Sequence, residues 1–137
     1  MKELRLQASA DRLEDVQEFI RGELEAAGGS LKVMSQVEIA VEEIYVNIVH
    51  YAYPSGDGEA AIRCETDREV PKITIQFLDA GTPFDPLAKE DADIFLSAEE
   101  RSIGGLGILM VKKLMDEVTY CYEEGKNILT IVKYLGA

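Results

Sequence analysis

The sequence predicts an α+β fold: a two-layer sandwich in which a mixed, mainly antiparallel sheet is covered on one face by helices. Apolar residues recur at helical spacing in three stretches, and they alternate with polar residues in five stretches of strand length. Turn residues separate these stretches. The resulting order is strand, helix, helix, strand, strand, irregular segment, helix, strand, strand, which favours one sheet with its helices on one side.

The first strand is predicted where Leu4, Leu6 and Ala8 alternate with charged or polar neighbours. At a sheet edge, such a strand offers unpaired backbone groups to a second copy of the chain. A homodimer that pairs through this edge is therefore compatible with the sequence. A helix over about residues 11–27 follows, and the glycine pair at 28–29 ends it.

The second and longest helix opens at Ser30 or Ser35 and runs to about Tyr53. Its apolar line has the spacing of a buried helix face and consists of Val37, Val41, Ile44 and Ile48. A separate polar line, spaced i, i+4 and i+7, consists of Glu43, Asn47 and His50. A carboxylate and an amide in an apolar frame lose solvation unless something binds them, so this line is a candidate site. The alternative is a helix with scattered polar positions.

Two strands are predicted next, over about residues 59–65 and 70–79. In the second strand, the alternation puts Asp79 on the same buried face as Ile75 and Phe77. A buried carboxylate at a strand end is a candidate binding group. The alternative is that Asp79 only starts a turn, as aspartate often does.

An irregular segment over about residues 80–104 separates these strands from the rest of the chain. A segment of this length with little regular structure is usually functional or mobile, and we interpret it as a lid. A solvated loop without a function is the alternative. The turn formed by Gly104, Gly105, Leu106 and Gly107 then opens a helix, an arrangement that presents free amides to an anion. Such a turn also serves close helix packing. Strands over 117–123 and 127–135 complete the chain.

The composition limits the class of partner. The 137 residues fit one domain, carry a net charge of −12 and contain two cysteines far apart in sequence. The negative charge argues against nucleic acid and anionic membrane as main partners. No stretch resembles a signal peptide or reaches membrane-spanning length. We therefore expect a cytoplasmic protein with reduced thiols.

Three of these features, taken in order, resemble the nucleotide-binding boxes of the GHKL ATPase/kinase superfamily, which has the Bergerat fold. The pair Glu43 and Asn47 resembles its N box. The run Asp79-Ala80-Gly81-Thr82-Pro83 resembles its first glycine box, and Gly105-Leu106-Gly107 resembles the second. The resemblance covers nearly the whole chain, from the first helix to the last strand, and we expect residues 1–137 to form one ATP-binding kinase-like domain.

The chain is most similar to the anti-sigma-factor serine kinases of bacterial partner-switching systems. In that group His50 would follow the N box, and the Glu-Arg-Ser run at 100–102 would precede the second glycine box. The resemblance implies ATP and Mg²⁺ as cofactors, a STAS-type anti-sigma-factor antagonist as the substrate and a sigma factor as a further partner. The bulky residues Ile44 and Tyr45 depart from the small residues expected in this box.

The resemblance also implies roles for single residues. Glu43 would be the general base, and Asn47 would give an oxygen to Mg²⁺. Asp79 would accept a hydrogen bond from the exocyclic amine of adenine, and Gly81 would let the backbone approach the flat base. Pro83 belongs to the same box. The run Gly104 to Gly107 would face the phosphates.

Three further assignments are open. Arg101 would steady the terminal phosphate or else form a surface ion pair. Thr130 would hold the adenine edge or be an ordinary strand residue. His50 would orient a partner or be structural. Two functions follow, a serine/threonine kinase or an ATP-dependent binding module without phosphotransfer, and the presence of Glu43 favours the kinase.

Overall fold

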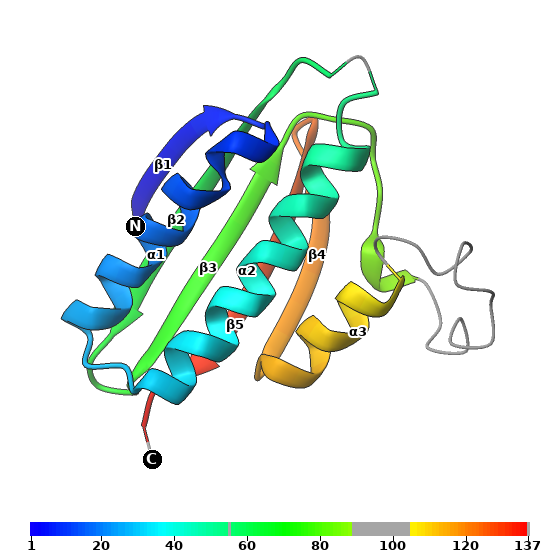
Figure 1. The fold of residues 1–137 in the computed structure, drawn as a ribbon. Coiled ribbons are helices and arrows are strands. Elements are labelled where there is room, and N and C mark those ends of the chain that lie inside the picture. Colours follow the sequence, from blue (N-terminus) through cyan, green and yellow to red (C-terminus); the bar gives the residue numbers. More distant parts are fainter. Residues whose placement is uncertain (55, 89–104, 137) are drawn as a thin grey trace.

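The computed structural model describes residues 1–54, 56–88 and 105–136 (Figure 1). The strands and helices follow the predicted order. They are β1 (Lys2–Gln7), η1 (Ala10–Arg12), α1 (Leu13–Ala26), α2 (Leu31–Tyr51), β2 (Glu59–Asp67), β3 (Lys72–Asp79), η2 (Pro86–Ala88), α3 (Gly105–Leu114), β4 (Glu117–Glu123) and β5 (Lys126–Tyr134). Most of the predicted lid, residues 89–104, lies outside the described part of the chain.

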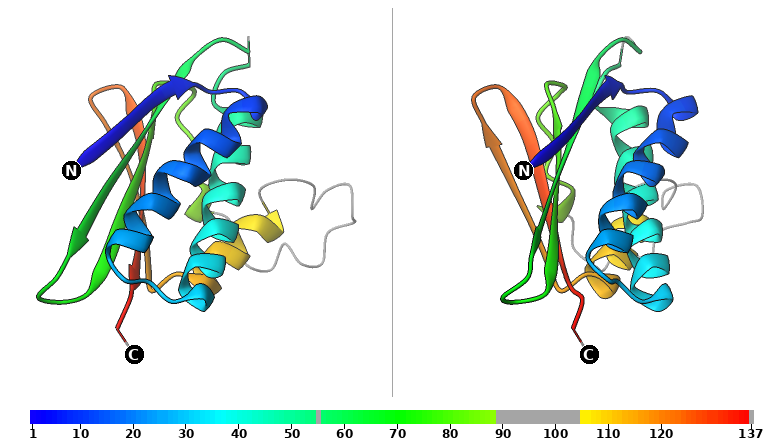
Figure 2. Two further views of the ribbon diagram at one scale, coloured as in Figure 1. Left: turned by 60° about the vertical axis from the view of Figure 1, so that its left-hand side comes forward. Right: turned by 90° about the vertical axis from the view of Figure 1, so that its left-hand side faces the viewer.

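The five strands form one sheet in the order β1-β2-β3-β5-β4, and the helices lie on one of its faces (Figure 2). All four strand pairs are antiparallel, so the expectation of a mixed sheet is wrong on this point. The strands of the β2–β3 and β4–β5 hairpins are antiparallel because a short turn joins each pair. After α3 the chain enters β4 at the edge of the sheet, and β5 then returns between β4 and β3, antiparallel to both. The turn of the second hairpin has positive φ at Glu124 and Gly125, as a two-residue hairpin turn requires.

Helix α2 is capped by Ser30, whose side-chain oxygen accepts a hydrogen bond from the backbone N–H of Val33 at 3.2 Å. Of the two serines that could open the helix, Ser30 is therefore the cap. The predicted apolar line of α2 is buried, together with Ala40 and Tyr45. The bulky Tyr45 fits because its ring is in the core, and its hydroxyl donates to the Ser9 carbonyl at 2.7 Å.

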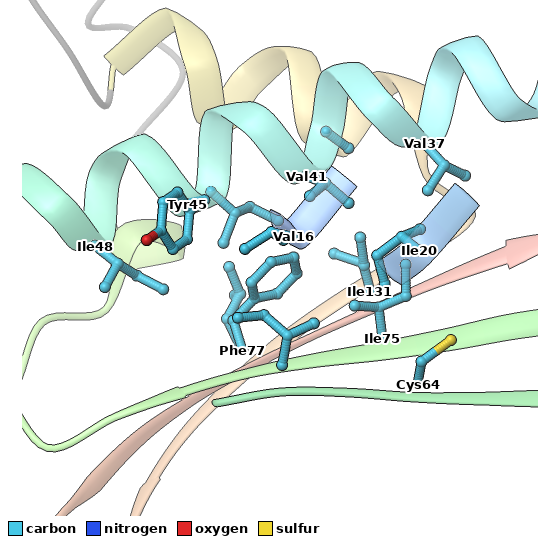
Figure 3. Close-up of a cluster of buried hydrophobic side chains, with 14 of the residues drawn as sticks. Val16, Ile20, Val37, Val41, Tyr45, Ile48, Cys64, Ile75, Phe77 and Ile131 are labelled. Carbon is cyan, nitrogen blue, oxygen red and sulfur yellow. The ribbon is translucent and has the colours of Figure 1, made fainter. Parts of the chain in front are cut away.

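The core fills the space between the sheet and helices α1 and α2 (Figure 3). Strand β3 lies in the middle of the sheet and contributes Ile73, Ile75 and Phe77 from its helix-facing side. Helix α3 packs beside α2, over the β4–β5 side of the sheet (Figure 1). The thiol of Cys64 is buried in the core, whereas Cys121 is exposed, and both are free. Among the described residues, no helix has both the length and the apolar character of a membrane span.

Candidate functional site

A pocket of about 470 Å³, including its open mouth, lies between α2, the start of α3, the end of β3 with the segment that follows it, and the β4–β5 hairpin. Its walls are mostly apolar, and six residues define its chemistry: Asn47, Tyr51, Phe77, Asp79, Tyr120 and Asn127. An apolar pocket with a few convergent polar groups is the usual form of a small-molecule site. We therefore take it as the candidate functional site.

Asp79 is the last residue of β3, and its carboxyl group lies at the pocket with only 7% of the residue exposed. Its Oδ1 accepts hydrogen bonds from the Gly81 backbone N–H at 3.0 Å and from Asn127 Nδ2 at 2.9 Å. Both bonds use the same oxygen, and no described residue donates to Oδ2. A carboxylate oxygen without a donor at the wall of a pocket is a strong acceptor for a ligand N–H. Asp79 thus continues the buried face of β3, as one of the two interpretations of the sequence proposed.

Asn127 is a residue of this site that the sequence interpretation missed. It pairs directly with Asp79 in the β3–β5 register and is 7% exposed. Its Nδ2 donates to Asp79 and also to the Thr82 carbonyl at 3.0 Å. Its Oδ1 accepts from the Phe84 N–H at 3.1 Å and from the Tyr120 hydroxyl. With all its donors and acceptors engaged, Asn127 orients the carboxylate and ties β5 to the segment after β3.

Tyr120 contributes to the wall of the pocket from β4. Burial raises the pKa of its hydroxyl above the ordinary tyrosine value, although the bond to the backbone at Phe84 works in the opposite direction. The hydroxyl therefore stays protonated at neutral pH and serves as the donor to Asn127.

Thr130 is not brought to this pocket, so its predicted place at the adenine edge is wrong. It pairs with Gln76 in the register, and its hydroxyl oxygen lies 3.5 Å from Gln76 Nε2. Side chains alternate between the two faces of a strand, and Thr130 is three positions from Asn127. Thr130 and Gln76 therefore lie on the sheet face opposite the helices.

Gly81 sits directly against the C-terminal end of α2. A Cβ at this position would lie 2.1 Å from the carbonyl oxygen of Ala52, which is a backbone atom that cannot move away cheaply. The same carbonyl accepts a hydrogen bond from the Thr82 N–H at 2.9 Å. The absence of a side chain at Gly81 therefore lets the segment after β3 dock on α2. Pro83, by contrast, is exposed and does not line the pocket.

Asn47 lines the pocket from α2, and its Nδ2 is buried without a hydrogen-bond partner among the described residues. Such an unpaired buried amide costs free energy, and a ligand oxygen in the pocket would satisfy it. Glu43 lies one turn earlier, at the contact between α2 and α3. A Cβ on Gly107 would stand 2.4 Å from Glu43 Oε2, so the carboxylate lies against the first turn of α3.

His50 does not line the pocket, contrary to its predicted place in the binding site. It is exposed at the end of α2, with its ring centroid 6.3 Å from that of Tyr51. The stripe of α2 that lines the pocket is shifted by one residue from the predicted polar line, and it consists of Ile44, Asn47, Ile48 and Tyr51. His50 therefore points away from it.

The second glycine box is described only in part. Gly105, Leu106 and Gly107 form the first turn of α3, at the site's edge, as predicted for a glycine turn that opens a helix. Arg101 and Gly104 lie outside the described residues, and their roles stay predictions.

The chain has relatives among known proteins. It matches the family model of the histidine kinase-like ATPase domain over residues 6–133. It is 32% identical over 114 residues to the serine-protein kinase RsbW of Listeria monocytogenes, covering 80% of this chain and 71% of that protein. It is 30% identical over 142 residues to the serine-protein kinase RsbW of Staphylococcus aureus, covering 97% and 86%.

Solved structures show the same fold. One contains the RsbU and RsbW domains of Rv1364c from Mycobacterium tuberculosis, with a TM-score of 0.65 and 15% identity. That match covers 98% of this chain but only 33% of the solved one. The catalytic domain of the histidine kinase ThkA gives a TM-score of 0.54 and 10% identity, with 98% of both chains covered. The match over residues 6–133 and the sequence relatives, which include the serine-protein kinases named RsbW, confirm the resemblance to the GHKL superfamily. This chain belongs to the histidine kinase-like ATPase domain family.

Proposed function

We propose that this chain is an ATP-dependent serine/threonine protein kinase that phosphorylates a STAS-type anti-sigma-factor antagonist and so regulates a sigma factor. The observation that carries the proposal is the buried Asp79 carboxylate, which is oriented by Asn127 and keeps one oxygen for a ligand. The names of the relatives, serine-protein kinases, support the kinase activity.

Adenine suits the chemistry of the pocket. Its exocyclic amine is a donor, and Asp79 Oδ2 is an acceptor without a partner in the described chain. The flat base would be enclosed by apolar walls that include Ile48 and Phe77. The carboxylate has a fixed direction because both hydrogen bonds to Oδ1 come from groups that are themselves held in place. This pre-orientation lowers the ordering cost of binding.

A magnesium ion suits the same site only together with the nucleotide. The described residues contain no cluster of three or more histidine, cysteine or acidic side chains that could hold a metal ion. The unsatisfied amide of Asn47 offers one side-chain group at the pocket. The unsatisfied atom is Nδ2, a donor suited to a phosphate oxygen. The Oδ1 of the same amide would be the one oxygen that Asn47 gives to the ion, while phosphate oxygens and water supply the rest, and the bound ion would neutralise phosphate charge.

In this proposal Glu43 acts as the general base. The substrate's serine oxygen would attack the γ-phosphorus, and the bond from that phosphorus to the β–γ bridging oxygen would break. The proton of the hydroxyl would pass to the Glu43 carboxylate, and ADP would leave. The amides of Gly105 and Gly107 at the start of α3 would face the phosphates, together with Gly104. Arg101 would steady the charge of the transferred group.

The proposed setting follows from charge and topology. A net charge of −12 disfavours nucleic acid and anionic membrane as main partners, which agrees with the two protein partners proposed, the antagonist and the sigma factor. We propose that the chain meets both in the cytoplasm. Strand β1 is an edge strand of the sheet, and a second copy would form a homodimer against it.

The proposal is tested with the purified chain, γ-labelled ATP, Mg²⁺ and STAS-type proteins from the same genome. We expect label on a serine or threonine of one of these proteins, and none on its variant whose acceptor residue is alanine. If ATP binds but no label is transferred, the chain is an ATP-dependent binding module. If ATP does not bind, the nucleotide proposal itself is wrong.

A further inference from the structure

We infer that Tyr53 is a positioning residue for adenine recognition, because its hydroxyl fixes the backbone directly after Asp79. The inference rests on the proposed function of the pocket and adds a residue that does not touch the nucleotide. Tyr53 follows α2 by two residues, is half-buried and does not line the pocket.

The Tyr53 hydroxyl bridges two strands at the point where their pairing stops. It accepts a hydrogen bond from the Ala80 backbone N–H at 2.9 Å and donates one to the Glu59 carbonyl at 2.5 Å. The last antiparallel pair of β2 and β3 is Ala60 with Asp79, so Glu59 and Ala80 would form the next pair. Instead of a direct continuation of the sheet, the hydroxyl links these two residues.

The ring of Tyr53 is held in place by a glycine. A Cβ at Gly58 would lie 2.3 Å from three ring carbons of Tyr53, so the ring occupies the space that a side chain would need. The Gly58 carbonyl is itself fixed, since it accepts a hydrogen bond from the Ala8 N–H at 2.8 Å. The hydroxyl therefore has a defined position when it meets Ala80.

The Tyr53 hydroxyl acts on the Asp79 carboxylate through Ala80, the residue that lies between the two contacts. Ala80 lies between Asp79 and Gly81, and the Gly81 N–H is one of the two donors that orient Asp79 Oδ1. With Ala80 held by Tyr53 and Thr82 held by the Ala52 carbonyl, the Gly81 amide cannot turn away from Asp79. Loss of the Tyr53 hydroxyl frees one end of this short segment.

The test compares ATP with inosine triphosphate, which carries an oxygen in place of the adenine amine. In the unaltered chain we expect ATP to bind at least about tenfold more tightly, the size of one hydrogen bond to a charged acceptor. In Tyr53→Phe the ratio should fall to within about threefold, because Asp79 loses its fixed direction. Affinity for inorganic tripolyphosphate, which makes no contact with Asp79, should be the same in both proteins.

Tyr45→Phe is the matched control. The Tyr45 hydroxyl also bonds to backbone groups, the N–H and carbonyl of Ser9, but far from the segment after β3. We expect Tyr45→Phe to lose thermal stability and to keep the full preference for ATP. Gly58→Ala, which displaces the Tyr53 ring and leaves its hydroxyl present, should lower the preference as Tyr53→Phe does.

The outcomes separate the two claims. An unchanged ATP preference in both Tyr53→Phe and Gly58→Ala overturns the role of Tyr53 and leaves the proposed function intact. Equal loss of ATP, inosine triphosphate and tripolyphosphate binding also overturns it, since a general structural effect would do this. No preference for ATP in the unaltered chain is a failure of the adenine proposal itself.

Discussion

The carboxylate of Glu43 occupies the space that a side chain on Gly107 would need. A Cβ built on Gly107 lies 2.4 Å from Glu43 Oε2 and 3.3 Å from its Cδ, so the contact joins α2 to the first turn of α3. The atom in the way is the end of a flexible side chain and not backbone. An added methyl group would therefore displace the carboxylate more readily than it would disturb the fold.

Gly107→Ala should consequently damage phosphotransfer while sparing stability. Alanine in a helix is favoured over glycine by about 1 kcal/mol, which offsets the local crowding, so the melting temperature should change little. A shift of the base by about 1 Å can cost on the order of 100-fold in rate. Single-turnover transfer at saturating ATP measures this. In a Glu43→Gln background, Gly107→Ala should add almost nothing, and a multiplicative effect there would contradict the shared mechanism.

Glu43→Gln tests the base alone, because glutamine keeps the shape of the side chain and cannot take the proton. We expect the ATP dissociation constant to stay within about threefold, whereas transfer falls by about 100-fold or more. The neighbouring exposed Glu42 offers a control, and Glu42→Gln should behave like the unaltered chain. Near-normal transfer by Glu43→Gln would remove Glu43 from the chemistry.

Gly81→Ala should destabilise the whole domain, because its Cβ would lie 2.1 Å from a backbone oxygen of Ala52. A clash of this kind costs on the order of 3 kcal/mol or more of the free energy of unfolding. Gly22, in the middle of α1, has no atom within 4 Å of a built Cβ, so Gly22→Ala should instead stabilise by about 0.5–1 kcal/mol. Urea unfolding of the two variants measures the contrast, and equal effects would show that Gly81 is not docked on α2.

The buried thiol of Cys64 predicts a loss of stability at alkaline pH. Burial raises the pKa of Cys64 to about 12. In the unfolded chain the pKa of a thiol is about 8.5. Above that pH the folded state therefore keeps a proton that the unfolded state releases. This contribution to stability is complete below about pH 8.5 and decreases as the pH rises towards 12.

The free energy of unfolding, measured between about pH 8 and 10, where an ordinary thiol titrates, tests whether stability decreases as the pH rises. Cys64→Ala should show a shallower decrease with pH, whereas Cys121→Ala, at an exposed position, should keep the original slope. The hydroxyls of Tyr45, Tyr53 and Tyr120 have raised pKa values through burial, and they contribute at higher pH. An identical slope in Cys64→Ala would contradict the assignment to this thiol.

The elements of the fold were predictable because each has a local cause in the sequence. Ser30 caps α2, and the alternation in β3 correctly placed Asp79 on the buried face. The direction of strand pairing was not predictable in the same way. It depends on how α3 returns the chain to the sheet, which no local pattern records, and the sheet is antiparallel throughout its described pairs.

The errors at the site concern which face of β5 and which stripe of α2 meet the pocket. Both faces of β5 carry apolar residues, so the alternation alone does not tell which face meets the helices, and Thr130 was chosen where Asn127 is the partner of Asp79. On α2, the spacing of Glu43, Asn47 and His50 defines a stripe correctly. The pocket, however, follows the adjacent stripe from Asn47 to Tyr51, because its other walls include residues of the sheet such as Phe77 and Leu129.

The central claim is that Asp79 recognises the adenine of ATP, and calorimetric titration of Asp79→Asn tests it most directly. Asparagine can still accept from Gly81 and Asn127 through its oxygen, so the fold should persist. Its other end is then an N–H₂ donor, which cannot accept from the adenine amine. We predict that Mg-ATP binds the unaltered chain and raises its melting temperature, and that Asp79→Asn binds at least about 30-fold more weakly. Equal affinity in a folded Asp79→Asn protein, or no ATP binding by the unaltered chain at millimolar nucleotide, would contradict the claim.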